Sequence, residues 1–391
     1  MKMMRGFRLR LGGRVAAGCV AAAGCLAAAG CVAATATVTT AAVTTAAVST
    51  PVAPAPSGLV PRSADLTVGN PEGKAPVPSA GRAVNTSHPD QVVGKGTPAS
   101  CTSAAVVNAV AHGGITTFNC GANPVTITMT ATAKVVNTSR EIVLDGGGKI
   151  TLSGGGKIRI LYMNTCDPRQ ELVTNGCWEQ QWPRLVVQNL TFRNAYSALP
   201  QTSASSYGGG AIFDEGGQLT VVNSAFIDNR CYPNGPDLGG AAIRAYGMYL
   251  GTPVYITDDT FTGNTCSNGA ARSGLYANFD VIDSLMSDNQ AIGFGANPAA
   301  YGTRGGGSGG AIYTDGDGYS LTVNGTVIRG NTAREGGGGI FFVVNARGGS
   351  LTIQNSTMVN NPSGRFQDAP GIFDSVNGHD TRPVVIQSSV S

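Results

Sequence analysis

Hydrophobic and polar residues alternate in short segments that recur through the second half of the chain. An eleven-residue motif of the type Leu-x-Val-x-Asn-x-x-Phe-x-x-Asn begins at Leu185, Leu219, Val254, Phe279, Leu321, Leu351 and Val384, the last copy being incomplete. Alternation with a period of two predicts β-strands, and segments of this length are too short for helices.

A second, glycine-rich motif of the type Gly-Gly-Ala-Ile precedes most of these copies. It begins at Gly209, Gly240, Gly274, Gly309, Gly338 and Gly371. Starts of the eleven-residue motif lie 25 to 42 residues apart, while the order of the two motifs is constant. A constant order with variable spacing indicates one structural unit per repeat, with loops absorbing the differences in length. We therefore expect an all-β fold, a right-handed parallel β-helix. Another all-β repeat is the alternative, although a propeller blade needs four strands and a longer period.

One position of the eleven-residue motif predicts a corner of each coil. Asn189, Asn223 and Asn355 occupy it, and Asp258, Asp283, Gly325 and Ser388 replace asparagine in other copies. Asparagine and aspartate tolerate left-handed backbone and hydrogen-bond neighbouring amides at bends. Stacked coils would bring these side chains together in a ladder.

The cysteines test the stacking independently. Cys231 and Cys266 each lie two residues after the last asparagine of a motif copy, so they hold equivalent positions in consecutive coils. Adjacent strands lie ~4.8 Å apart, and a disulfide requires Cα atoms ~4.4–6.8 Å apart. We predict a Cys231–Cys266 disulfide and, by proximity in sequence, Cys101–Cys120 and Cys166–Cys177. A structural zinc site is the alternative, but paired C-x-x-C spacing is missing.

The N-terminal part of the sequence differs in composition. A basic stretch, an apolar run over residues 15–34 and the tripeptide Ala34-Thr35-Ala36 predict a signal peptide over residues 1–36, with a lipid-modified Cys31 as the alternative. Residues 37–100 are rich in Thr, Ala and Pro and predict a disordered linker. Residues 101–391 form the expected β-helix. It begins with a short capping helix that starts at Thr102 or Ser103 and ends at His112.

The strand Gly-Gly-Ala-Ile followed by Phe-x-x-Asn, as at residues 226–229 and 261–264, resembles the repeats of polymorphic outer membrane proteins. The coil architecture resembles the wider pectate-lyase-like superfamily, over roughly residues 101–391. That superfamily includes lyases, hydrolases, adhesins and surface proteins, so the resemblance implies a fold and leaves the activity open. The chain departs from the outer membrane type because no segment suited to a membrane barrel follows, and we expect none.

In the pectate-lyase-like fold the first strand of each coil lines a long surface groove. If the isoleucine of each Gly-Gly-Ala-Ile points inward, the residues that point out are Phe213, Arg244, Tyr276, Tyr313, Phe341 and Phe373, followed two positions later by Glu215, Tyr246, Asn278 and Asp315. Aromatic rings suit the apolar faces of sugars, so this series predicts a polysaccharide-binding groove. A ladder of rings that only stabilises the sheet is the alternative. A shift of one residue would instead place the rings in the core.

No catalytic constellation stands out. Glu215 and Asp315 would lie three coils apart, ~14 Å at the usual strand spacing, whereas glycoside hydrolysis needs carboxyl groups roughly 5–10 Å apart. Asp258, Asp259 and Asp283 could hold Ca²⁺, with replacement of the corner asparagines as the alternative. We otherwise expect no cofactor.

Composition narrows the partners of the protein. The chain has 56 glycines, 13% charged residues and a formal net charge of +3, which is too small to predict nucleic-acid binding. We expect a secreted or cell-surface monomer that binds extracellular polysaccharide or a cell-surface partner without cleaving it. A polysaccharide lyase or glycoside hydrolase acting in the same groove is the alternative.

Overall fold

The computed structural model describes residues 68–198, 208–235, 238–296, 306–346, 348–376, 379–380 and 382–391. These residues belong to one compact unit. The expected signal peptide, the lipid-modification alternative and the first part of the expected linker lie outside them. None of the helices in the described ranges has the length and apolar character needed to cross a membrane.

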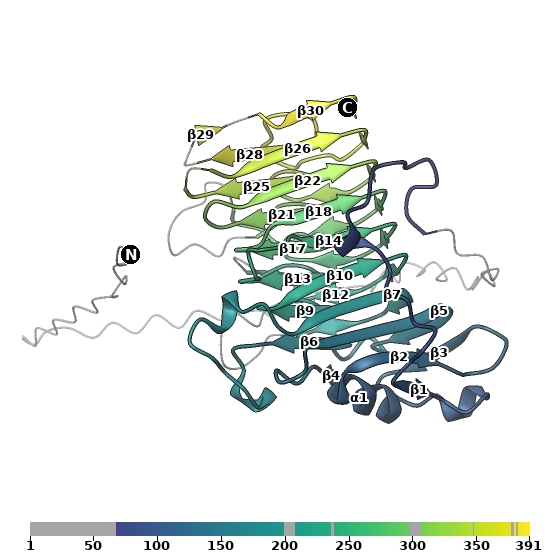
Figure 1. Ribbon diagram of the computed structural model, residues 1–391. Coiled ribbons are helices and arrows are strands. Elements are labelled where there is room, and N and C mark those ends of the chain that lie inside the picture. The colour runs from purple at the N-terminus through teal and green to yellow at the C-terminus, as the bar shows by residue number, and fades with distance from the viewer. Residues whose placement is uncertain are drawn as a thin grey trace, which may run out of the picture. The chain divides into compact units, whose positions relative to one another are not determined.

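The described residues are mostly parallel strands in three sheets, and Figure 1 shows the strands stacked one above another from α1 to β30. Sheet A has seventeen strands: β1 (Gln91–Val93), β2 (Gly114–Phe118), β3 (Val125–Thr128), β5 (Glu141–Ser153), β7 (Arg184–Arg193), β10 (Gln218–Val222), β11 (Ala225–Ile227), β14 (Val254–Thr257), β15 (Thr260–Thr262), β18 (Phe279–Ile282), β19 (Leu285–Ser287), β22 (Ser320–Asn324), β23 (Val327–Arg329), β26 (Ser350–Gln354), β27 (Thr357–Val359), β30 (Val384–Ile386) and β31 (Ser389–Val390).

The other two sheets are smaller. Sheet B has nine strands: β4 (Ala133–Lys134), β6 (Leu161–Asn164), β9 (Ile212–Glu215), β13 (Ile243–Tyr246), β17 (Arg272–Leu275), β21 (Ile312–Asp315), β25 (Ile340–Val344), β28 (Ile372–Val376) and β29 (His379–Asp380). Sheet C has five: β8 (Tyr196–Ser197), β12 (Arg230–Cys231), β16 (Thr265–Cys266), β20 (Gln290–Ala291) and β24 (Thr332–Ala333). Every pairing between these strands is parallel except that of β28 with β29.

The chain visits the sheets in a repeated order, from B through two strands of A to C and back to B. We call one such passage a coil. This order is compatible with a parallel β-solenoid, and it agrees with the two motifs, because the Gly-Gly-Ala-Ile segments lead into sheet B and the eleven-residue motifs form sheet A.

In-register columns of apolar side chains build the core. One column contains Val187, Val221, Ile256, Val281, Val323 and Ile353, all fully buried. Another contains Phe192, Phe226 and Phe261, whose rings stack 5.0 and 4.7 Å apart. Burying one such side chain stabilises the fold by about 1.5–3 kcal/mol, so the stack gains stability coil by coil.

The predicted corner is left-handed, as expected. Asn189, Asn223, Asp258, Asp283 and Asn355 all have φ between 47 and 56°. Asn223 donates to Asn189, which donates in turn to Asp145, so a short side-chain ladder forms there. At the last corner the left-handed residue is Gln387. Since Gln354 pairs with Ile386, Gln387 is the residue that aligns with the corner residue Asn355, and the assignment of this corner to Ser388 was one residue too late.

A second, longer ladder is buried where sheet A passes to sheet C. The final asparagine of the eleven-residue motif forms it: Asn229, Asn264, Asn289, Asn331 and Asn361. The side-chain amide of each of the first four donates to the side-chain carbonyl oxygen of the next, at 2.8 to 3.0 Å, and all five residues are at most 4% exposed. The ladder satisfies polar groups that would be costly to bury alone.

All three predicted disulfides are present. Cα–Cα separations are 5.7 Å for Cys101–Cys120, 5.1 Å for Cys166–Cys177 and 4.8 Å for Cys231–Cys266. The last of these confirms that consecutive coils stack with equivalent positions in contact.

The boundary expected at residue 100 differs from the structure, because residues 68–100 pack on the coils. We call residues 68–90 the strap. It runs along sheet A from the level of β18 to that of β1, in purple in Figure 1, and includes η1 (Ser79–Gly81). Ala75 donates its backbone amide to the Asp283 carboxylate, and Val84 donates to the side chain of Gln188. These contacts use backbone amides, which composition does not reveal.

The expected N-terminal helix is α1 (Ser103–His112), preceded by η2 (Pro98–Ser100). The Thr102 hydroxyl accepts from the Ala105 amide at its start, and Gly113, with φ 81°, follows its end. Val106 and Val110 are buried, and α1 lies beside β1 and β4. Two further 3-10 turns, η3 (Pro168–Gln170) and η4 (Cys177–Glu179), lie in the loop between β6 and β7.

Candidate functional site

The residues expected to line the groove lie along sheet B, and the register partly confirms their alignment. Phe213 pairs with Arg244 in adjacent strands. Tyr313, Phe341 and Phe373 are partners in three consecutive strands. The column therefore exists, with an interruption between Arg244 and Tyr313.

The placement of Tyr276 in this column was wrong, because Ser273 pairs with both Arg244 and Tyr313. In this coil the glycine-rich motif begins at Gly269, which has φ 47°, and not at Gly274. Strand β17 therefore starts at Arg272, two residues before Gly274. Arg272 occupies the inward position that isoleucine holds in the neighbouring strands, so the motif cannot be recognised from the sequence here. Asn278, counted from Tyr276, is displaced for the same reason and accepts a hydrogen bond from the Ser320 amide.

The aromatic rings of the column contact one another face to face. Tyr162 and Phe213 stack with centroids 5.4 Å apart, Tyr313 and Phe341 at 5.0 Å, and Phe341 and Phe373 at 5.1 Å. Phe213 is fully buried and Tyr313 is 6% exposed. Rings whose faces are covered by each other have little face left for a sugar, so these contacts mainly hold adjacent strands together.

A different aromatic cluster lies where sheet B turns toward sheet A. We call Tyr246, Tyr276 and Tyr319 the tyrosine ridge; all three are half-buried. Tyr246 and Tyr276 meet edge to face at 6.0 Å and 78°, and Tyr276 and Tyr319 at 5.7 Å and 81°. Unlike the stacked rings Phe213 and Tyr313, the three ridge tyrosines therefore keep part of their surface accessible. The ridge unites two predicted residues with Tyr319, which the sequence did not single out.

Two glycines make room for the ridge and for a neighbouring tryptophan. A Cβ at Gly316 would lie 3.2 Å from the Tyr319 ring and 3.3 Å from the Tyr276 ring. A Cβ at Gly247 would lie 3.0 Å from the Cβ of Trp178, whose side chain is 44% exposed. Trp178 directly follows Cys177, at the end of the loop closed by the Cys166–Cys177 disulfide. The loop therefore brings a fourth, more exposed ring close to Tyr246.

Carboxylates surround the tyrosine ridge. Burial and, to a smaller extent, electrostatic interactions with Tyr276, Asp317 and Glu179 together raise the pKa of Tyr319 to about 12. Asp315 pairs with Leu275, which pairs with Tyr246, so the predicted alignment of Asp315 with Tyr246 holds. The surroundings of the ridge are therefore acidic and rich in hydrogen-bond acceptors.

The predicted Glu215 lies at the end of β9, beside Asn164 at the end of β6. Its carboxylate accepts a hydrogen bond from the Asn164 amide at 2.7 Å and is mostly buried. Burial raises the pKa of Glu215 to about 7, although the Asn164 bond and the positive charge of Arg244 act in the opposite direction. At neutral pH this carboxyl group can therefore carry or release a proton.

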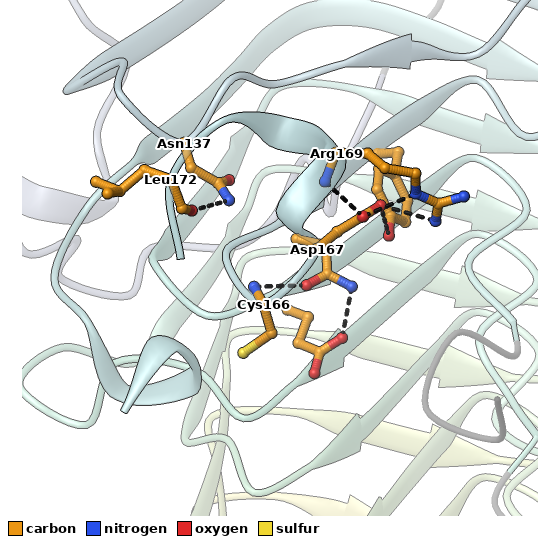
Figure 2. Close-up of polar contacts among 8 residues, drawn as sticks. Asn137, Cys166, Asp167, Arg169 and Leu172 are labelled. Atoms are coloured by element: carbon orange, nitrogen blue, oxygen red, sulfur yellow. Dashed lines mark hydrogen bonds and ion pairs between the residues drawn. The ribbon is translucent and has the colours of Figure 1, made fainter. Parts of the chain in front are cut away.

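A second acid, Asp167, lies near Glu215 and, unlike it, is fully ionised at neutral pH. Figure 2 shows its carboxylate bound by Arg169, with Nε–Oδ1 at 2.9 Å. Tyr162 donates its hydroxyl to the other oxygen at 3.0 Å. Although burial raises the pKa of Asp167, the bonds from Arg169 and Tyr162 bring it down to about 2. The negative charge of Asp167 in turn contributes to the raised pKa of Glu215.

The sequence did not identify Asn164 and Asp167 as site residues. Both lie at or after the end of β6, where the repeat is irregular and the chain enters the loop closed by Cys166 and Cys177. The one sequence feature that could have pointed to them is the predicted Cys166–Cys177 disulfide, because it holds this loop beside the first regular coils.

The three aspartates considered for Ca²⁺ do not form a metal cluster. Asp259 is fully buried and accepts hydrogen bonds from the amides of Ser224 and Thr257. Asp283 accepts from the strap residue Ala75, and Asp258 lies at the left-handed corner. Within the described ranges, no group of three or more His, Cys, Asp or Glu residues could hold a metal ion.

No family model, curated protein or solved structure matches the chain. The tyrosine ridge and the pair Glu215 and Asp167 are therefore the features of this chain that indicate a function.

Proposed function

We propose that this chain is an exported protein that binds an extended extracellular polysaccharide along the tyrosine ridge without cleaving it. The ridge supports this proposal because its rings lie on successive coils and are only half-buried. Tyrosine combines an apolar face for the C–H surface of a sugar with a hydroxyl for its polar groups. A row of such rings suits a ligand that repeats along one direction.

The charge around the ridge favours a neutral polysaccharide. Glu179 and Asp317 are exposed, and both act electrostatically on Tyr319. Exposed carboxylates would repel a polyanion at low ionic strength, whereas a neutral sugar hydroxyl can donate hydrogen bonds to them. A cell-surface protein partner is the competing occupant, and a binding experiment distinguishes the two.

The fold proposed for this function is a right-handed parallel β-helix of the pectate-lyase-like type, with α1 covering its N-terminal end. The recurring order of the three sheets and the position of α1 beside β1 and β4 support it. Export is supported by the three disulfides, which are typical of extracellular proteins, and by the basic and apolar N-terminal sequence.

A glycan array on the oxidised protein, followed by titration of the best ligand, tests binding. We expect a neutral polysaccharide to bind, and Tyr246→Ala and Tyr319→Ala each to weaken it by about tenfold, which corresponds to ~1.4 kcal/mol. Tyr196→Ala, on sheet C, is the matched control and should leave the affinity unchanged. Absence of glycan binding, or equal affinity of both ridge variants and wild type, would refute the proposal.

Glycoside hydrolysis is a second candidate, favoured by the different states of Glu215 and Asp167. A carboxyl group with a pKa of about 7 suits a general acid, and a carboxylate with a pKa of about 2 stays ionised beside it. New reducing ends released from polysaccharides would reveal hydrolysis, and unsaturated products would reveal a lyase. If hydrolysis occurs, Glu215→Gln should abolish it, whereas Tyr196→Ala should not.

A further inference from the structure

A pocket on sheet C lies apart from the tyrosine ridge and from the Glu215 cluster. Its volume is about 410 Å³, and it is lined by Gly156, Tyr196, Arg230, Cys231, Pro233, Thr265 and Ile292. The lining comes from β8, β12 and β16 in consecutive coils and from the segments next to β5, β12 and β20. A volume of this order suits a small organic molecule.

Arg230 supplies the positive charge of the pocket. It is exposed and pairs in register with Tyr196 on one side and Thr265 on the other. Among the described residues, its guanidinium group has no hydrogen-bond or ion-pair partner. The acid closest in sequence, Asp228, instead pairs with Arg193 at 3.1 Å. An unpaired guanidinium group with its planar set of donors suits a carboxylate.

The remaining walls combine apolar surface with one hydroxyl group. Tyr196 presents a half-buried ring, Ile292 is 37% exposed, and Thr265 can donate or accept a hydrogen bond. Gly156 keeps the space beside the arginine open, because a Cβ there would lie 3.3 Å from Nη2 of Arg230. The pocket therefore places one cation beside an aromatic and an aliphatic surface.

We propose that this pocket binds a small organic anion, namely a carboxylate carried on a flat or cyclic apolar body. Arg230 contacts the carboxylate, while Tyr196 and Ile292 contact the two sides of the ring. This site is independent of polysaccharide binding, because it belongs to sheet C and shares no residue with the ridge.

Calorimetric or NMR titration of the full disulfide-bonded chain with benzoate tests the proposal. We expect saturable binding that weakens by at least about tenfold in Arg230→Gln, ~1.4 kcal/mol, and by several-fold in Tyr196→Ala. Benzyl alcohol, which keeps the ring and lacks the charge, should bind at least about tenfold more weakly than benzoate. Because Arg230 is exposed, Arg230→Gln should keep the wild-type unfolding midpoint.

Two variants control for nonspecific effects. Arg334→Gln removes an exposed arginine that lies over Phe294, outside the pocket lining, and should not change benzoate affinity. Tyr319→Ala should also leave benzoate binding intact while weakening the glycan, so the two proposals can fail separately. Lack of saturable binding would overturn the anion site. Equal binding of benzoate by wild type and Arg230→Gln, or equal binding of benzoate and benzyl alcohol, would overturn it as well.

Discussion

Arg272 is a charged side chain in a column of isoleucines, and we predict that replacing it stabilises the protein. It pairs in register with Ile243 and Ile312 and is fully buried. Its Nη1 donates to the Thr314 hydroxyl at 2.8 Å, while Nε and Nη2 have no hydrogen-bond partner among the residues that the structure describes. Its guanidinium carbon lies 3.8 Å from the centre of the Phe279 ring. Arg272→Met keeps an unbranched side chain of similar length and removes the charge.

The magnitude follows from these contacts. Burial lowers the pKa of Arg272 from 12.5 to about 9, which corresponds to about 5 kcal/mol of penalty on the charged form. The contact with Phe279 and the bond to Thr314 offset about 4 kcal/mol of this penalty. Methionine adds about 1–2 kcal/mol of apolar burial. The net gain expected for Arg272→Met is about 2 kcal/mol, similar to the roughly 1–4 kcal/mol found when buried ion pairs are replaced by apolar residues.

Urea unfolding of the oxidised protein measures this gain as a higher midpoint at unchanged slope. Arg244→Met is the matched control. Arg244 is also buried, but it donates to Ser273 at 2.6 Å and attracts Glu215, so its loss should destabilise the fold by about 1–3 kcal/mol. A lower midpoint for Arg272→Met than for wild type would refute the reasoning. It would mean that the ring and hydroxyl contacts outweigh the penalty of burying the charge.

The same structure gives four further predictions. Asn289→Leu, in the middle of the buried ladder, should lower the unfolding free energy by about 3 kcal/mol. It removes the oxygen that accepts from the backbone and side-chain amides of Asn264, and the amide that donates to Phe261 and Asn331. Urea unfolding checks this, with the exposed Gln290→Ala as a neutral control. The pKa of Glu215 is raised from 4.5 to about 7 in the folded state, so between these values the native state binds more protons than the unfolded state. The stability that proton binding at Glu215 adds is complete below about pH 4.5 and is lost as the pH rises through 7. Glu215→Gln should flatten this part of a stability-versus-pH curve, and an unchanged curve would contradict the assignment. Asp214 is fully buried, and within the described part of the chain neither of its carboxylate oxygens accepts a hydrogen bond. Burial raises the pKa of Asp214, so Asp214→Asn should raise the thermal midpoint at pH 8 more than at pH 5. Cys231→Ser together with Cys266→Ser should cost about 2–4 kcal/mol in unfolding free energy, measured against the oxidised wild type.

Much of the fold could be predicted from the sequence because its strongest signals lie in the core. The motif valines and phenylalanines fill identical positions in each coil, so their alignment in the sequence is also their contact pattern in space. The two equivalent cysteines, Cys231 and Cys266, depend on the same alignment, and they form a disulfide.

The candidate site was harder to predict because it depends on departures from the repeat. Arg272 in an isoleucine position hid the true start of its strand and shifted Tyr276 out of the expected column. Tyr319 and Asp167 lie in connecting segments of irregular length, where spacing carries no information about neighbours. The asparagine of the buried ladder recurs at the end of each motif copy in the sequence, but only the structure shows that its side chain points into the core.

The strap has a consequence for the order in which the protein can fold. Its hydrogen bonds join residues far apart in sequence: Ala75 to Asp283 across 208 residues, and Asn70 to Gly325 across 255. Such contacts carry a large loop-closure cost and form after local ones. The first part of the strap, around Asn70 and Ala75, can therefore dock only after the coil that contains β18 exists. During synthesis the corner residue Asp283 of sheet A stays uncovered until this part of the strap docks on it. A pause in translation before Gly325 would therefore leave the corner exposed to proteases.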